Sequence, residues 1–264
     1  MKDTAAAHDP ARDPDPVLRR MARHASVRDF RDAPIPEEHV ERAIRAASMA
    51  ATSSHVIGYA LLEVRAAEKR EKLAELAGGQ PQVARAGRFF VVCAEQRRHR
   101  LAARRAGRPF VPNFESFLVD VIDAALFAQN LALAFEALDY GTCYIGGLRT
   151  HLPVVDEVLD LPKDVFALFG LAVGLPETVP ATKPRLGVDA LRCVDRFPSE
   201  VELERQLDEF DATMADYYRS RGLEGRNWTG GLAAKFASPK REHLYEYYRR
   251  KGAVLHTLDA SESP

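Results

Sequence analysis

The chain contains a segment whose residue types and spacing could hold an anion. In RHASVRDF, residues 23–30, an extended backbone would put His24, Ser26 and Arg28 on one face, because side chains alternate along a strand. Two potential cations and a hydroxyl that face the same way suit an anionic ligand. The other interpretation is a solvated loop whose charges face one way by chance, and this segment alone favours that interpretation.

Two later segments add a second basic pair and a pair of glycines. Pro184 has a fixed φ and biases the preceding residue towards an extended backbone, so Lys183 and Arg185 can point the same way. Gly146 and Gly147 follow a short predicted strand, where they let backbone N–H groups come close to a ligand. Each signal is weak when it is taken alone.

The signatures of several common enzyme classes are missing. The chain has no GxGxxG, GxxxxGKS/T, GxSxG or HExxH, which argues against the usual dinucleotide-binding, P-loop, hydrolase and zinc-protease sites. The eight histidines have no metal-ligand spacing, and the three cysteines include no CxxC pair. We therefore expect neither a metal site nor a disulfide framework.

Charge and composition limit the kinds of molecule that the chain is expected to bind. Lys and Arg number 37 against 38 Asp and Glu, a net charge of −1, so there is no global basic footprint for nucleic acid or an anionic membrane. The first residues lack the apolar stretch of a signal peptide, and a cytoplasmic location is expected. Residues 114–138 are long and apolar but include six acidic or amide residues. They predict a helix buried in the core or at a subunit interface, not a membrane span.

The elements that must position these residues follow from hydrophobic spacing and from helix caps. Helices are predicted to begin at Pro16 and Pro36, to cover 68–77, 114–138, 153–161 and 199–221, and to follow Pro239. Strands are predicted at 59–64, 88–94, 141–145 and 166–173. Because the strands are few, this pattern indicates one α+β domain with a helical C-terminal extension.

The order of these segments resembles the oxygen-insensitive NADPH nitroreductase and NADPH–flavin oxidoreductase family, in its larger, NADPH-preferring group. The resemblance covers roughly residues 15–255. It is carried by RHASVRDFRDAPI, ATSSH, LAGGQPQVARAGRFFVVCA, AQNLALAFEALDYGTCYIGGLR, LFGLAVGLP, KPRL and YYRSRG. It implies a dimeric, nitroreductase-like α+β fold with a central, mostly antiparallel sheet flanked by helices. The implied organisation is a disordered tail (1–14), an FMN-binding domain (15–195), a helical extension packing on that domain or on the dimer partner (196–258) and a second tail (259–264).

The resemblance also implies a bound FMN at the interface of a homodimer, with NADPH as co-substrate. Lys183 and Arg185 match the pair that clamps the FMN phosphate, and the backbone of Gly146 and Gly147 matches the part that faces the flavin ring near N5 and O4. The residues implied to hold FMN are His24, Ser26, Arg28, Ser53, Ser54, Gln80, Tyr144, Ile145, Gly146, Gly147, Lys183 and Arg185. Those implied to bind NADPH are Arg221 and Arg226, and those implied in the acceptor pocket are Ser54, His55 and Arg241.

The implied activity is a ping-pong reaction in which NADPH passes a hydride to FMN and an acceptor, such as a nitroaromatic or a quinone, then takes two electrons. No catalytic side chain is implied beyond the flavin, and Arg28 gives electrostatic support by favouring negative charge on the reduced ring. One alternative is an NADPH–FMN reductase that supplies free reduced flavin. An alternative from a different class is a non-catalytic flavin-binding or anion-binding module.

Three features depart from the family pattern. Ala25 stands where the family often has a second basic residue, and His55 replaces an apolar or aromatic residue near the acceptor pocket. The stretch 96–112, QRRHRLAARRAGRPFVP, is longer and more basic than expected. A solvated helix or loop explains this stretch, and a site for an anionic partner, nucleic acid included, is the alternative.

Overall fold

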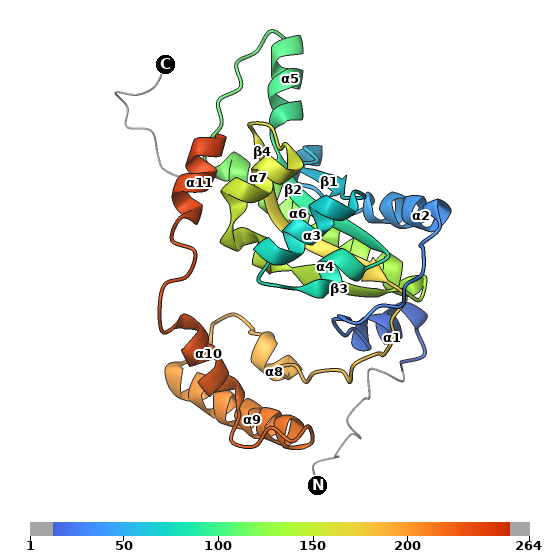
Figure 1. Ribbon diagram of the computed structural model, residues 1–264. Coiled ribbons are helices and arrows are strands. Elements are labelled where there is room, and N and C mark those ends of the chain that lie inside the picture. The colour runs from blue at the N-terminus through green and yellow to red at the C-terminus, as the bar shows by residue number, and fades with distance from the viewer. Residues whose placement is uncertain (1–12, 254–264) are drawn as a thin grey trace. The chain divides into compact units, whose positions relative to one another are not determined.

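The computed structural model describes residues 13–253, which form two compact units (Figure 1). Within these residues the first unit comprises 13–180 and 241–253, and the second comprises 181–240. The expected domain boundary at 195/196 therefore falls inside the second unit, and the last helix groups with the first. The expected tails lie outside the described residues, apart from Asp13 and Pro14.

The first unit is built on a four-stranded sheet. Its strands are β1 (Tyr59–Glu63), β2 (Arg88–Glu95), β3 (Gly141–Ile145) and β4 (Val165–Gly174), paired in the order β1-β2-β4-β3. All three pairings are antiparallel, as expected. The two central strands are buried along nearly their whole length, which agrees with their continuous apolar runs.

Helices cover both faces of this sheet (Figure 1). On one face α2 (Glu37–Ala47) and α6 (Phe114–Ala137) form a core with the alternate strand residues Phe90, Val92 and Leu171. On the other face Phe89, Val91 and Ala172 pack in a second core. Its helices are α3 (Ala67–Leu76), α4 (Pro81–Arg85), α7 (Leu152–Leu159) and α11 (Leu244–Lys251). The two cores follow directly from the alternation of side chains along a strand.

The apolar segment 114–138 is a core helix. α6 begins with a capping box, in which Asn113 Oδ1 accepts from the Ser116 N–H and Ser116 Oγ accepts from the Asn113 N–H. It is the one described helix that is long and apolar enough to cross a membrane, and it packs against β1, β2 and α2. One side remains open, because Phe114, Leu118, Ile122 and Leu126 recur every four residues and are exposed.

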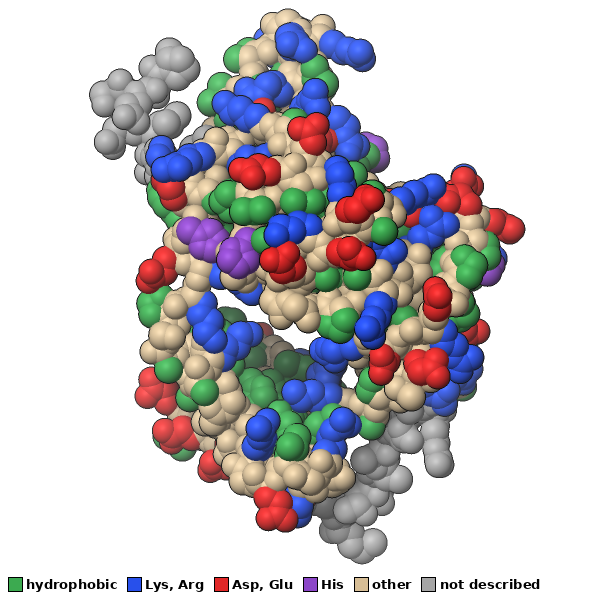
Figure 2. All heavy atoms as spheres, in the orientation of Figure 1, with side chains coloured by type: hydrophobic (Ala, Val, Ile, Leu, Met, Phe, Trp, Pro, Cys, Tyr) green, Lys and Arg blue, Asp and Glu red, His purple; other side chains and the backbone are tan. Residues whose placement is uncertain are grey.

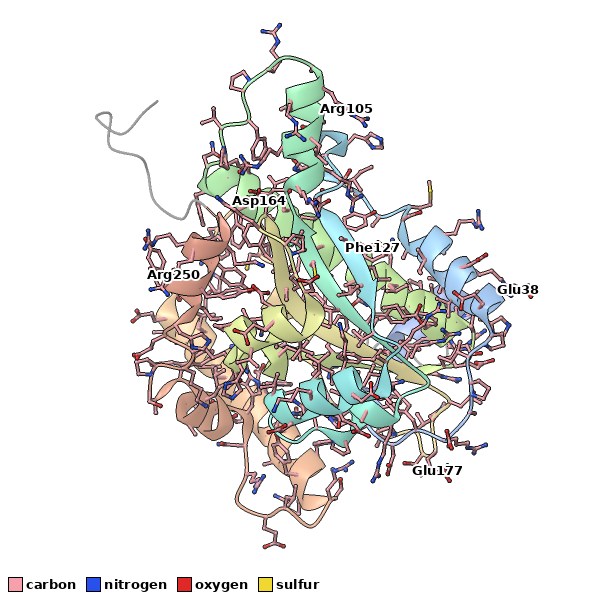
Figure 3. All side chains as sticks on the ribbon, turned by 45° about the horizontal axis from the view of Figure 1, so that its top comes forward. Glu38, Arg105, Phe127, Asp164, Glu177 and Arg250 are labelled. Atoms are coloured by element: carbon pink, nitrogen blue, oxygen red, sulfur yellow. The ribbon has the colours of Figure 1, made fainter. Side chains whose placement is uncertain are left out.

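Short elements connect this framework. α1 (Pro16–Ala22) begins at the predicted cap, where Asp15 Oδ1 accepts from the N–H groups of Val17 and Leu18. The basic stretch forms α5 (Arg97–Arg105), an exposed helix over which Lys and Arg side chains gather in Figure 2. Its tip, at Arg105, lies away from the core residue Phe127 (Figure 3). Two 3-10 turns, η2 (Ser53–His55) and η3 (Gly146–Thr150), complete the first unit.

The second unit is helical. It contains α8 (Val188–Leu191), α9 (Glu200–Arg219) and α10 (Trp228–Phe236). α9 begins with the predicted capping box, in which Ser199 Oγ accepts from the Glu202 N–H. α10 packs on α9 through Trp228, whose ring lies edge-on to Phe210 at 5.4 Å between centroids.

Candidate functional site

The predicted first segment lies along the start of β3. Ser26 forms a parallel bridge with Thr142, and the Val27 N–H donates to the Thr142 carbonyl at 2.9 Å. Val27 is buried against Gly141, where a Cβ would lie only 2.6 Å from Val27 Cγ2. Since Val27 faces the core, the alternation places its neighbours Ser26 and Arg28 on the other side, as the extended interpretation predicts.

A buried carboxylate that the sequence analysis missed orients this segment. Glu136 lies on α6, and its Oε1 is 2.8 Å from His24 Nδ1 and accepts from Thr142 Oγ1 at 2.7 Å. The contact fixes the His24 ring relative to β3. The only signal in the sequence was a glutamate inside an otherwise apolar helical stretch, which does not indicate its partner.

Arg28 has no carboxylate partner among the described residues. Its Nη1 donates only to the Ser26 carbonyl, at 3.3 Å, and its side chain is exposed. Burial raises the pKa of the Cys143 thiol, and the nearby Arg28 charge opposes that rise. Arg28 therefore lies beside β3 with its positive charge available to a ligand.

The far end of β3 brings two further predicted segments together. Gln80 precedes α4, and its Nε2 donates to the Ala77 carbonyl at 2.7 Å, while its Oε1 accepts from Gln82 Nε2 at 2.9 Å. Gly147 packs directly on this amide, because a Cβ there would lie 2.3 Å from Ala77 O and 2.6 Å from Gln80 Nε2. A larger residue could not bring η3 so close to Gln80.

The side chains of Tyr144 and Ile145 point into the protein. Ile145 is fully buried, and the Tyr144 ring packs edge-on to Phe169 at 5.5 Å between centroids. Burial raises the pKa of Tyr144, so its phenol stays protonated.

Two arginines lie at η3, one of them unexpected. Arg241, predicted for the acceptor pocket, has a left-handed backbone (φ 59°) and donates from Nε to Thr150 Oγ1 at 3.3 Å. Arg149, which the sequence analysis missed, donates from Nη1 to the Leu168 carbonyl at 2.7 Å. Burial, with the Arg241 charge as a smaller cause, lowers the pKa of Arg149. The turn that carries Gly146 and Gly147 is therefore flanked by two cations.

Ser53, Ser54 and His55 form a separate group. They lie in η2, which is tied to α6 and not to the Gln80 cluster: the Ser53 N–H donates to Asp123 Oδ1 at 3.0 Å. Their predicted role, across a subunit interface from the rest of the site, stays a prediction.

The remaining predicted residues are in the second unit. Lys183 Nζ lies 5.6 Å from the ring centroid of Tyr218, and the Arg221 guanidinium lies 5.6 Å from that of Tyr217. The two rings are neighbours at the end of α9, so Lys183 and Arg221 are brought together on this unit. Arg185 Nη1 donates to the Lys183 carbonyl at 2.6 Å, and Arg226 is exposed in the loop before α10. Their meeting with His24, Ser26 and Arg28 stays a prediction.

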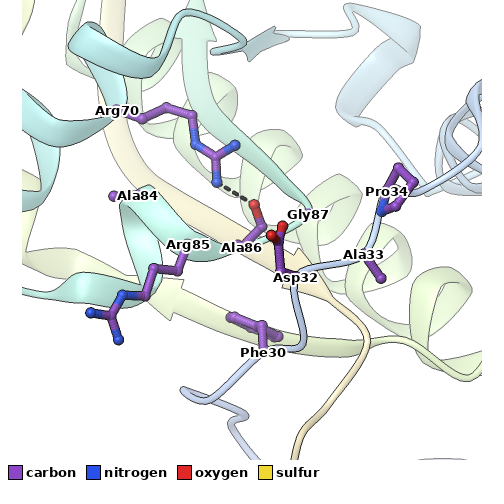
Figure 4. A pocket seen from close by; sticks show the side chains of 9 residues that line it. All are labelled: Phe30, Asp32, Ala33, Pro34, Arg70, Ala84, Arg85, Ala86 and Gly87. Atoms are coloured by element: carbon purple, nitrogen blue, oxygen red, sulfur yellow. Dashed lines mark hydrogen bonds between the residues drawn. The ribbon is translucent and has the colours of Figure 1, made fainter.

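A cavity of about 580 Å³ has a different lining (Figure 4). Its lining includes Phe30, Asp32 and Arg85, and Arg70 donates to the Val83 carbonyl at 3.1 Å and to the Ala86 carbonyl. None of the predicted site residues lines it. The candidate site is therefore the group of segments around β3.

Comparison with known proteins assigns the chain to a family. Residues 21–175 match the model of the nitroreductase family, and residues 183–256 match the model of its C-terminal domain. The chain belongs to the nitroreductase family. It is an NADPH-dependent flavin oxidoreductase/nitroreductase family enzyme. The expected resemblance and the expected α+β nitroreductase fold are confirmed, and the non-catalytic module is not supported.

Several relatives match this nitroreductase-family chain over nearly their whole length. It is 36% identical over 242 residues to FMN reductase (NADPH) of Bacillus subtilis, covering 89% of this chain and 97% of that protein. It is 33% identical to the oxygen-insensitive NADPH nitroreductase of Salmonella typhimurium, covering 90% and 98%. The solved structure of B. megaterium NfrA1 superposes with a TM-score of 0.88 at 36% identity, covering 90% of this chain and 99% of that chain.

Proposed function

We propose that this enzyme holds FMN around β3 and uses NADPH to reduce small-molecule acceptors such as nitroaromatics and quinones. The observation that carries the proposal is that one strand gathers three of the predicted flavin-binding segments. Ser26 pairs with Thr142 at its start, Gly147 follows its end, and Gln80 packs on Gly147. The residues present fit a flavin nucleotide, because the site combines an unpaired cation, a hydroxyl, an amide and a glycine turn.

In this proposal each residue binds or orients a part of FMN. Arg28 would favour negative charge on the ring of bound FMN, and His24 is held in place by Glu136. Lys183 and Arg185 hold the phosphate, and Arg221 and Arg226 bind the NADPH 2′-phosphate. Bound FMN supplies the two-electron chemistry, since none of the protein groups must act as a nucleophile.

We also propose a homodimer in which Ser53, Ser54 and His55 complete the site of the partner subunit. The proposal is supported by the apolar stripe of α6, where exposed side chains recur along more than three turns. Exposed apolar side chains in such a continuous row are typical of subunit interfaces.

A second candidate is the supply of free reduced FMN to another enzyme. It is favoured by the relative named FMN reductase (NADPH), which is as similar to this chain as any relative reported above. The two roles differ in whether flavin leaves the protein after reduction.

The test is an anaerobic titration of FMN-reconstituted, desalted protein with NADPH, followed by visible absorbance. We expect retained flavin to lose its visible absorbance at about one NADPH per flavin, because bound FMN accepts the two electrons of the hydride. Protein that retains no FMN would contradict the site around β3. Flavin that is retained but not reduced would contradict the NADPH assignment, and reduced flavin that passes through a membrane filter would favour the second candidate.

A further inference from the structure

The backbone between Ser53 and Gly58 is strained. Ser54, His55 and Ile57 have φ angles of 48°, 57° and 53°, and none of the three is a glycine. L-residues disfavour this left-handed region because Cβ crowds the following carbonyl, and a β-branched residue such as Ile57 disfavours it most. Such a conformation persists only where surrounding contacts hold it.

One side chain holds both ends of this loop. Asp123 of α6 is fully buried, and its Oδ1 accepts from the Ser53 N–H at 3.0 Å while its Oδ2 accepts from the Gly58 N–H at 3.2 Å. Hydrogen bonds to an ionised carboxylate are stronger than those between neutral groups. The carboxylate therefore fixes the distance between the two ends and leaves the intervening residues little freedom.

The loop N–H groups are the main hydrogen-bond partners of Asp123. It forms no ion pair among the described residues, so the two loop N–H groups stabilise its buried charge. The loop has two further tethers: His99 Nε2 lies 2.8 Å from the Val56 carbonyl, and the Gly58 carbonyl accepts from the Glu95 N–H at 3.0 Å. Asp120, one turn earlier on α6, is equally buried and packs against Gly58, but it accepts no N–H from the loop.

We infer that Asp123 is a positioning residue, which holds Ser53, Ser54 and His55 in the strained conformation that they present to flavin and acceptor. The inference rests on the proposed function for the role of those three residues. The clamp itself rests only on the contacts of Asp123. In the absence of the clamp, the left-handed residues relax towards ordinary backbone conformations and the three side chains change direction.

The first test is hydrogen exchange of the full-length protein without FMN. In Asp123→Asn an amide oxygen can accept from only one of the two N–H groups. We expect the Ser53 or the Gly58 amide to exchange about tenfold faster than in the wild type, a factor that corresponds to about 1.4 kcal/mol. The matched control Asp120→Asn replaces a buried carboxylate that bonds neither amide, so neither amide should exchange faster than in the wild type. Unchanged exchange in Asp123→Asn, or an equal change in the control, overturns the clamp.

The second test uses the FMN-loaded enzyme and separates positioning from general stability. We expect Asp123→Asn to raise the KM for the acceptor by about tenfold with kcat within about twofold, since Ser54 and His55 of the proposed acceptor pocket are displaced while the residues around β3 still hold the flavin. A changed exchange rate with an unaltered KM overturns the positioning role. If the variant does not fold, the wild type decides: its Ser53 and Gly58 amides should be protected like those of α6, and fast exchange there overturns the clamp.

Failure of the proposed function has a different signature. A wild-type protein that retains no FMN, but whose Ser53 and Gly58 amides respond to Asp123→Asn, would leave the clamp standing and overturn its role at a flavin site.

Discussion

Arg28 combines an exposed guanidinium with the absence of any carboxylate partner in the described part of the chain. A unit charge at about 4 Å, in an effective dielectric near 20, contributes roughly 4 kcal/mol before desolvation is subtracted. Solvent screening at an exposed side chain reduces this figure further. The residue can therefore tune a bound flavin without being needed for the fold.

We expect Arg28→Ala to lower the midpoint potential of bound FMN by tens of millivolts, because about 1.4 kcal/mol corresponds to about 30 mV for a two-electron couple. Potentiometric titration of the FMN-loaded variant measures the shift. Arg31→Ala is the matched control, since Arg31 is also exposed and pairs with Glu177 at 3.5 Å. An unchanged potential in Arg28→Ala would show that the guanidinium does not act on the ring.

We expect Arg221 and Arg226 to determine the preference for NADPH over NADH. Loss of a charge-assisted hydrogen bond to the 2′-phosphate weakens binding by about 1.5 to 3 kcal/mol, roughly ten- to a hundredfold. Arg221→Ala and Arg226→Ala should therefore raise the KM for NADPH and leave that for NADH nearly unchanged. Arg219→Ala, on the same helix end but paired with Asp216, is the control. If both variants keep the preference for NADPH, the assignment is wrong.

We expect the buried carboxyl group of Asp120 to make the stability of the folded protein depend on pH. Burial is the largest cause that raises its pKa, to about 6, opposed by Gln96 and His99 and assisted by Asp123 and Glu95. The folded protein therefore holds this proton at pH values where the unfolded chain releases it. Its contribution to stability is present at low pH and is lost as the pH rises from about 4 through about 6.

Asp120→Asn should remove that loss. A rise in pKa from about 4 to about 6 corresponds to up to about 3 kcal/mol of unfolding free energy. At pH 7.5 we therefore expect the variant to be more stable than the wild type by about 1 to 3 kcal/mol. Near pH 4 we expect no such difference. Urea unfolding at the two pH values measures the difference. An equal difference at both would mean that ionisation of Asp120 is not the cause.

At the scale of single elements, the stability of α9 depends on its capping box. Ser199 Oγ accepts from the Glu202 N–H, and the Glu202 carboxylate accepts from the Ser199 N–H at 2.8 Å. Ser199→Ala should destabilise the second unit by about 1 kcal/mol. Trp228 is the single tryptophan of the chain and packs on α9, so its fluorescence reports the unfolding of this unit. Glu204→Gln, exposed within the same helix, should leave the transition unchanged.

The regular elements were predictable and the turns that shape the site were not. β3 was predicted at its observed residues and the α9 cap at Ser199, because apolar runs and capping residues are local signals. The left-handed residues Ser54 and Ile57 have no such signal, since neither serine nor a β-branched residue favours positive φ. The contact between Glu136 and His24 joins residues far apart in the chain, and only the folded backbone brings them together.

Several site residues were predicted from a resemblance and not from their own chemistry. Gln80 is an example: its amide bonds to Ala77, and only the absence of a side chain at Gly147 shows why the two segments meet. The apolar face of α1 is also incompletely covered, because Val17, Leu18 and Met21 are about half exposed. A periodic apolar face predicts that something covers it, but does not identify the partner.

At the scale of the whole molecule, a continuous row of exposed apolar side chains lies on α6. Ile122 is 48% exposed and lies near the middle of the row. Ile122→Glu should convert the proposed homodimer to a monomer, because a charge on a self-complementary interface meets its own copy. Light scattering after size exclusion measures the mass, and FMN retention should fall with it. Arg45→Glu, on the exposed side of α2, is a surface control; a monomeric wild type would contradict the proposal.

The division of the chain into units has a consequence for its synthesis. α11 belongs to the first unit, where Tyr247 Oη donates to Asp156 Oδ1 at 2.7 Å and Lys251 pairs with the same carboxylate. At about 5 to 20 residues per second, a ribosome needs roughly 3 to 12 s to make the intervening second unit. During that time the surface of the nascent sheet and of α7 that α11 covers stays exposed. A chain released early, before residue 241, would leave this apolar surface open to chaperones and proteases.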